Sequence, residues 1–296
     1  MNLKNILNEI ETVDPEVYER LDTRRDTMRR FSFIGKALAL AAVPSALGSM
    51  FKKAYGQTAS DVTDVLLFAY LLENLEAEFY KKVVSSFTAI GVLAGAPQAA
   101  LTVIRDHEVA HVAFLKTVLN SMGTTPPTYS ASSFDFSGAK GAGNGPFAAA
   151  FSNYGVMLAV AQTFEDTGVR AYKGQAPRLI NNKTVLTAAL QIHSVEARHA
   201  SHIRQMRRNL TSGNLVPSGV TLQPWITLAQ SGIDTGNASA NAAIQMSYAG
   251  EDATTQANVN IVNIGGQTIA ASEASEAFDE PLTKAQITAI VNPFIV

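Results

Sequence analysis

The chain contains no cysteine, and this absence excludes several kinds of chemistry at once. Disulfides, thiolate metal sites, thiol nucleophiles and lipidated cysteine anchors all require a residue that the chain lacks. Tryptophan occurs once and histidine five times among 296 residues, so any site built from imidazoles must draw on a small set. The missing cysteines do not identify a compartment, because cysteine-free proteins occur in both redox settings.

Charged side chains are also scarce, and neither sign dominates. Asp, Glu, Lys and Arg make up 16% of the residues, and the net charge is −2. The basic face that nucleic-acid binding requires is therefore not expected. Apolar residues make up 47%, which is typical of helices with wide buried faces. The apolar run after Lys36 is about 15 residues long and contains Pro44, short of the roughly 20 residues that span a membrane.

The amino-terminal region has the layout of an export signal. Residues 24–51 read RRDTMRRFSFIGKALALAAVPSALGSMF, with two arginine pairs before an apolar run that ends in small residues. This order is similar to a twin-arginine signal and predicts a periplasmic or secreted protein, with cleavage near Gly48 or after Ala54. The alternative is an amphipathic or buried helix. In either case this segment is the candidate for membrane or envelope association.

Helical periodicity begins at Asp61 and defines the middle of the chain. The spacing of apolar residues and breakers predicts four helices, at about 60–88, 97–122, 147–173 and 183–209. Short links join the first helix to the second and the third to the fourth, which makes two antiparallel hairpins. The Gly-, Ser- and Pro-rich residues 124–146 form a long crossover that lets the second and third helices run parallel.

These features predict an all-α fold in three parts. The parts are an N-terminal signal-like or helical segment at 1–55, a four-helix bundle at 56–209 and a loop-rich C-terminal appendage at 210–296. Thr283 and Gln286 have capping-box spacing and predict a short last helix, and Trp225 is the candidate anchor of the appendage. A partner-binding or self-association role of the appendage stays open. Its acids are expected at the solvated surface: Asp234, Glu251, Asp252, Glu273, Glu276, Asp279 and Glu280.

All five histidines lie in two short stretches of the predicted bundle. IRDHEVAHVAFL (104–115) and IHSVEARHASHIR (192–204) each contain a Glu-x-x-His tetrad, Glu108 with His111 and Glu196 with His199. A carboxylate and an imidazole on adjacent turns form a ligand pair for iron, manganese or zinc. One such tetrad is weak evidence and is more often a surface pair, but two of them with apolar flanks favour a metal site.

The two hairpins repeat the same order of residues. Glu73 precedes Tyr80 by seven residues and Glu165 precedes Tyr172 by seven, which is nearly two helical turns. Each Glu…Tyr pair is followed by a Glu-x-x-His tetrad, at glutamate separations of 35 and 31 residues (73 to 108, 165 to 196). Antiparallel hairpins would bring these faces together, and the predicted metal ligands are Glu73, Glu108, His111, Glu165, Glu196 and His199.

The charges of this set also favour metal. Four carboxylates balance two divalent ions, whereas without metal they would repel one another in a bundle core and need protons. Glu76 and Glu78 compete with Glu73, but the match to Glu165 selects Glu73.

The remaining candidates are less tightly specified. His107 lies off the Glu108 face and is expected to be solvated. His193 and His202 flank the site on the same helix, and one of them is a candidate for an extra ligand or a contact to a ligand; Glu76 is a further candidate. Tyr80 and Tyr172 are core residues by default, but they are placed to hydrogen-bond the ligand carboxylates or to carry a radical.

This pattern resembles the ferritin-like superfamily, whose di-iron and di-manganese bundles carry a Glu on two helices and Glu-x-x-His on the other two. More narrowly, LLENLEAEFY, the twin-arginine-like start and the closing EAFDEPLTKAQITAIVNPFIV are similar to bacterial ferritin-like domain proteins related to plant desiccation-associated proteins. The resemblance implies a ferritin-like bundle with two divalent ions, iron or manganese, in a secreted or periplasmic setting.

Two hypotheses of function follow from the sequence. The first is a di-metal oxidoreductase that reacts with dioxygen or peroxide, of the ferroxidase or peroxide-removing type, with metal ions and small oxidants as its partners. The second is an envelope structural or stress-protection protein whose bundle is non-catalytic and mediates assembly, which includes homo-oligomers. A storage cage is less favoured, because its shell would have to accommodate the C-terminal appendage.

Overall fold

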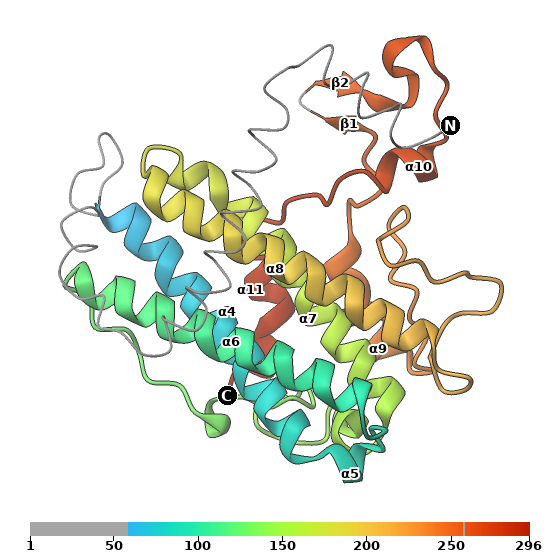
Figure 1. Ribbon diagram of the computed structural model, residues 1–296, viewed down its shortest axis with the longest axis horizontal. Coiled ribbons are helices and arrows are strands. Elements are labelled where there is room, and N and C mark those ends of the chain that lie inside the picture. Colours follow the sequence, from blue (N-terminus) through green and yellow to red (C-terminus); the bar gives the residue numbers. More distant parts are fainter. Residues whose placement is uncertain (1–58, 257) are drawn as a thin grey trace, which may run out of the picture. The chain divides into compact units, whose positions relative to one another are not determined.

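A computed structural model describes residues 59–256 and 258–296, and in this part the regular secondary structure is almost entirely helical (Figure 1). The all-α fold class predicted from the sequence is therefore confirmed. The predictions about residues 1–55, including the export signal, lie outside the described residues. The helices of the bundle region are α4 (Ala59–Ser85), α5 (Phe87–Ile90), α6 (Ala96–Ser121), α7 (Tyr154–Gln175) and α8 (Lys183–Arg208).

Four long helices pack as two antiparallel hairpins. The α4 and α6 helices form one hairpin, with the short α5 in the link, and α7 and α8 form the other (Figure 1). The long connection from Ser121 to Tyr154 lets α6 and α7 run in the same direction. The sequence predicted this parallel arrangement from the crossover at residues 124–146. Side chains from the hairpins share one core, in which Phe79, Leu101, Leu158 and Ile203 are fully buried.

The local sequence explains where the helices begin. Pro97 stands in the first turn of α6, and the Asn182 side chain accepts a hydrogen bond from the amide of Val185 at the start of α8. The third long helix begins at Tyr154 and not near residue 147. Asn153 caps it by accepting from the Val156 amide at 3.0 Å, and residues before it form a separate 3-10 turn, Ala148–Phe151.

The crossover is an ordered loop held by one aspartate. The Asp135 carboxylate accepts hydrogen bonds from the backbone amides of Ser137, Gly141 and Gly143 at 2.9 to 3.0 Å. The loop also contacts the end of the chain, because the Asp135 amide donates to the carbonyl of Phe294. The crossover and the carboxyl terminus therefore stabilise each other.

The region after residue 209 is irregular and contains only short helices and one pair of short strands. It contains α9 (Ala238–Gln245), α10 (Ala271–Ser275), α11 (Lys284–Val291) and the two-residue strands β1 (Thr255–Gln256) and β2 (Val259–Asn260), which pair antiparallel. The short last helix predicted from Thr283 and Gln286 is α11, and both capping-box bonds are present. This helix lies against α7 and buries Ile287, Ile290 and Val291 (Figure 1).

Two expectations about this region are wrong. Trp225 does not anchor it, because 49% of its surface is exposed. Glu251 is not solvated: its side chain is fully buried and lies 2.7 Å from the Arg170 guanidinium on α7. Buried polar contacts, together with core side chains such as Ile244 and Ile287, thus hold this region in place of the expected Trp225. A second set of buried contacts joins Tyr248 and Arg204 to the Asp166 carboxylate.

The lengths and compositions of the described helices bear on membrane insertion. Across residues 59–256 and 258–296, none of them combines the length and apolar character that a membrane span requires.

Candidate metal centre

The structure brings the six predicted metal ligands together in the middle of the bundle. Glu73 comes from α4, Glu108 and His111 from α6, Glu165 from α7, and Glu196 and His199 from α8. All four glutamates are completely buried, while the two imidazoles retain slight exposure. Buried acids at such a density are costly unless a positive charge compensates them.

One group of ligands converges on His111. Its Nδ1 atom lies 3.0 Å from Glu73 Oε2, 3.2 Å from Glu108 Oε2 and 3.2 Å from Glu196 Oε1. Ligand atoms of these four residues all lie within 4.8 Å of one another. This spacing is that of atoms in one coordination shell, where metal-ligand bonds are about 2.0 to 2.2 Å long.

A second group converges on His199 in the same way. Its Nδ1 atom lies 2.9 Å from Glu108 Oε1, 3.2 Å from Glu165 Oε2 and 3.9 Å from Glu196 Oε2. The four residues again offer ligand atoms within 4.8 Å of one another.

The two groups share Glu108 and Glu196, and each of these carboxylates divides its oxygens between them. Oε2 of Glu108 faces His111 and Oε1 faces His199, whereas Oε1 of Glu196 faces His111 and Oε2 faces His199. The glutamates of the two Glu-x-x-His tetrads are therefore placed to bridge two ions. Glu73 and Glu165 each belong to one group only.

Hydrogen bonds within the chain do not satisfy these groups, and two divalent ions would. One ring nitrogen cannot serve three carboxylates, because it has a single proton or a single lone pair. Glu108 Oε1 and both oxygens of Glu196 have no hydrogen-bond partner among the described residues, although they are buried. Divalent iron or manganese accepts mixed carboxylate and imidazole ligands, so the donor set fits such ions.

Without metal, the crowding of buried charged groups shifts the pKa values of the site residues. Burial raises the pKa of Glu73 to about 7, and burial together with the charges of Glu108 and Glu73 raises the pKa of Glu196 well above its usual range. Burial lowers the pKa of His199, but the Glu165 charge and the other carboxylates outweigh it and raise that pKa to about 11. Protons thus take the place of the compensating cations.

Tyrosine hydroxyls hold the two unshared glutamates. Tyr172 donates a hydrogen bond to Glu73 Oε1, and Tyr80 donates one to Glu165 Oε1. In each case the other carboxylate oxygen faces the histidine of the group. Each tyrosine therefore serves the glutamate of the other hairpin, a pairing that the seven-residue spacing alone does not reveal.

Glu76 is a buried neighbour of the centre, and Glu78 is not. Burial, followed by the charges of Glu196 and Glu108, raises the pKa of Glu76 well above its usual range. It belongs to neither ligand group, whereas Glu78 forms a surface ion pair with Lys81. A Cβ atom at Gly168 would lie 3.2 Å from Glu76 Oε1 and 3.5 Å from Glu196 Oε2, so glycine leaves these carboxylates their space.

His107 lies closer to the centre than its sequence position suggested. It is exposed, as expected, but its Nδ1 atom lies 2.9 Å from His199 Nε2 and the two rings stack. With His199 Nδ1 toward the carboxylates, the Nε2 proton is free to be donated to His107. The signal in the sequence was the four-residue step from His107 to His111, which puts both on one helix face.

The other two histidines lie apart from both ligand groups. His193 contacts the carbonyl oxygen of Val169 at 3.0 Å, and His202 is exposed on the outer side of α8. Neither belongs to the clusters found among the described residues. Of the three histidines on α8, only His199 thus belongs to the ligand groups.

Comparison with known proteins agrees with this geometry. The family model described as a ferritin-like domain matches residues 61–209, which include the four long helices from the first turn of α4 onward and all six predicted ligands. No curated protein and no solved structure matches the chain. Since the match extends over half of the chain, the chain belongs to the ferritin-like domain family.

Proposed function

We propose that this chain is a di-metal carboxylate protein that binds two divalent ions, iron or manganese, and uses them in a reaction with dioxygen or peroxide. The observation that carries the proposal is the pair of ligand groups joined through Glu108 and Glu196. Four carboxylates then balance the four positive charges of the ions. A structural site for one ion would not need two histidines, each with an unshared glutamate of its own, on either side of two shared carboxylates.

The residues of the chain have distinct tasks in such a centre. Glu108 and Glu196 would hold both ions, and His111 and His199 would bind one ion each. Tyr172 and Tyr80 donate hydrogen bonds to one oxygen of Glu73 and Glu165, which would leave the other oxygen free to bind an ion. When bound, the ions supply two electrons, which with two protons reduce dioxygen to hydrogen peroxide or hydrogen peroxide to water. The chain is thus a candidate oxidoreductase of the ferroxidase or peroxide-removing type.

Metal content tests the proposal most directly. We expect about two iron or manganese ions per chain in protein purified without affinity metals, as measured by elemental mass spectrometry. The Glu108→Ala variant should lose both ions, because Glu108 gives one oxygen to each group. The matched control is His202→Ala on α8, which removes an exposed imidazole outside both groups and should leave the content unchanged. A folded wild type that takes up neither metal under anaerobic loading would refute the proposal.

The rival function is an envelope structural or stress-protection protein in which the metal only stabilises the bundle and assembly is the activity. The metal would then raise the melting temperature without any consumption of dioxygen or peroxide. Oxidant consumption by the loaded protein, measured beside its melting curve and its mass in solution, separates the two functions. Size-exclusion chromatography with light scattering tests the proposed homo-oligomer in the same samples.

We also propose export to the periplasm or the exterior, directed by the arginine pairs and apolar run of residues 24–51. Fractionation of cells that produce the full chain, followed by N-terminal sequencing, tests this localisation. Replacement of both arginine pairs by lysine pairs should retain the protein in the cytoplasm. Equal export of that variant would contradict the twin-arginine route.

A further inference from the structure

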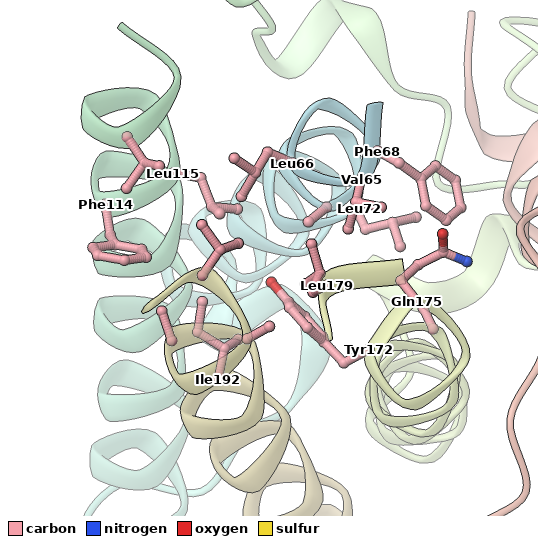
Figure 2. Close-up of a pocket in the computed structure, with 16 residues that line it drawn as sticks. Val65, Leu66, Phe68, Leu72, Phe114, Leu115, Tyr172, Gln175, Leu179 and Ile192 are labelled. Carbon is pink, nitrogen blue, oxygen red and sulfur yellow. The ribbon is translucent and has the colours of Figure 1, made fainter. Parts of the chain in front are cut away.

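An apolar cavity lies inside the bundle near the metal centre (Figure 2). All four long helices contribute to its walls, among them Phe68 of α4, Leu115 of α6, Tyr172 of α7 and Ile192 of α8. Figure 2 shows the Tyr172 ring reaching from α7 into the middle of these side chains. The cavity therefore lies between the long helices, next to the bundle core, and is partly open at half-buried residues such as Phe114 and Ala188.

The polar groups at its wall are turned to other partners. The Tyr172 hydroxyl donates to Glu73 Oε1, and the Gln175 side-chain oxygen accepts from Arg178. The remaining lining side chains are aliphatic or phenyl groups. A polar molecule that entered the cavity would lose its hydrogen bonds to water without forming new ones to the wall, which is unfavourable. Cavities of this composition favour apolar molecules.

The cavity occupies the layer of the bundle next to the ligands. Its lining residues Ala69, Leu115 and Ile192 stand four positions from Glu73, His111 and Glu196 on their respective helices. Four helical residues span about 6 Å, so the cavity lies about one turn from the carboxylates. Tyr172 joins the two layers, since its ring lines the cavity and its hydroxyl holds Glu73.

The size of the cavity limits what it can hold. Its volume is about 30 Å³, whereas a single water molecule needs roughly 10 to 15 Å³ on this measure. A molecule of two heavy atoms fits this space. The space is thus small, apolar and about one helical turn from the carboxylates.

We propose that this cavity binds dioxygen and delivers it to the metal centre. The inference rests on the proposed di-metal function and selects dioxygen over hydrogen peroxide as the oxidant that uses this path. Dioxygen is a diatomic molecule without a dipole and loses no hydrogen bonds on entering. Hydrogen peroxide has two hydroxyl groups and would leave them unpaired against this wall.

Xenon is a suitable probe, because it is apolar, of similar size and inert toward metals. We expect saturable xenon binding by the full-length, metal-loaded protein in 129Xe NMR. The Ala69→Leu variant fills the cavity from α4 and should abolish this binding, and Ala189→Leu fills it from a less buried position on α8 if the first variant folds poorly. The matched control is Ala99→Leu, an exposed position of α6 that does not line the cavity.

Stopped-flow kinetics then test delivery. In the cavity-filling variants, oxidation of the reduced, loaded centre by dioxygen should slow by about tenfold or more, while the rate with hydrogen peroxide stays the same. Ala99→Leu should match the wild type with both oxidants. Loss of rate with both oxidants, or unchanged dioxygen kinetics in a filled variant, would overturn the inference.

Failure of the proposed function would look different from failure of this inference. A wild type that binds no metal, or that reacts with neither oxidant, refutes the di-metal function whatever xenon does. A wild type that binds about two metals and reacts with dioxygen, but binds no xenon at the cavity, refutes the dioxygen path alone.

Discussion

Each glutamate of the centre is defined by what its two oxygens contact. Glu73 and Glu165 give one oxygen to a tyrosine hydroxyl and the other to a histidine, whereas Glu108 gives its oxygens to two different histidines. Four residues of the same type thus have different roles, because their carboxylate oxygens contact different partners. The tyrosine contacts are the ones that can be removed without removing a ligand.

Removal of one hydroxyl should therefore weaken the metal site without destroying it. Tyr172→Phe leaves the ring in the core but frees Glu73 Oε1, so the carboxylate loses its fixed orientation. Loss of such supporting contacts typically lowers metal affinity by about 10- to 100-fold. Competition with a metal-binding dye measures the change.

The matched control is Tyr154→Phe, which removes a hydroxyl in the first turn of the same helix. Equal affinities for wild type and Tyr172→Phe would show that the hydroxyl does not orient Glu73.

Metal affinity should rise with pH, most steeply below about pH 7 and less steeply from there to about pH 11. Burial raises the pKa of Glu73 to about 7, and the surrounding carboxylates raise the pKa of His199 to about 11, so Glu73 carries a proton below about pH 7 and His199 keeps its proton up to about pH 11. Both must lose their protons to bind metal, and binding therefore releases protons. Raising the pH removes this competition. Titration calorimetry in buffers of different ionisation enthalpy measures the protons released, and a pH-independent affinity over this range would contradict the assignment.

At the scale of elements, the direction of the helices decides which residues meet. Tyr80 lies seven residues, about 10.5 Å, beyond Glu73 along α4, too far to reach it. Because α7 runs antiparallel to α4, Tyr80 stands at the level of Glu165 and Tyr172 at the level of Glu73. The seven-residue spacing of Glu and Tyr, which occurs in both hairpins, therefore reflects hydrogen bonds from each tyrosine to the glutamate of the other hairpin.

The crossover loop should depend on Asp135. Burial raises the pKa of this carboxyl, but hydrogen bonds from Ser137, Gly143 and Gly141 outweigh it and lower that pKa to about 2. The charged form is therefore the stabilising one: its contribution is complete above the ordinary value near 4 and is lost as the pH falls through about 2. Asp135→Ala should cost about 1 kcal/mol at pH 7, a low value chosen because the group is partly exposed.

Urea unfolding measures this difference, with Asp252→Ala as the control for loss of an exposed acid in another loop. Equal stabilities of Asp135→Ala and wild type would show that the loop does not rely on the carboxylate.

At the scale of the whole described molecule, the C-terminal region is joined to the bundle through buried polar contacts. Arg170 of α7 is 1% exposed, contacts Glu251 at 2.7 Å and donates to the carbonyls of Ser247 and Ala249. Burial raises the pKa of Glu251 to about 7, and the Arg170 charge offsets only part of this effect. Such a pair is costly to break, because the remaining charge is left without a partner in the interior.

Arg170→Ala should consequently destabilise the protein by about 3 to 5 kcal/mol. The surface arginine Arg178, which pairs with Asp64 at 2.8 Å, gives the matched control, and its loss should cost about 0 to 1 kcal/mol. Denaturant unfolding of both variants measures the contrast. Similar costs for the two variants would mean that the C-terminal region does not depend on Arg170.

The sequence by itself determined the four long helices and the six residues that meet at the centre. Periodicity and capping residues are local properties, and the repeated order of Glu, Tyr and Glu-x-x-His can be read without knowing any contact. Only the tertiary structure decided which glutamates face both histidines, which hairpin each tyrosine serves and that His107 contacts His199. It also decided that Glu251, and not Trp225, is buried against the bundle. These outcomes depend on helix direction and on contacts between residues far apart in the chain, which no local pattern specifies.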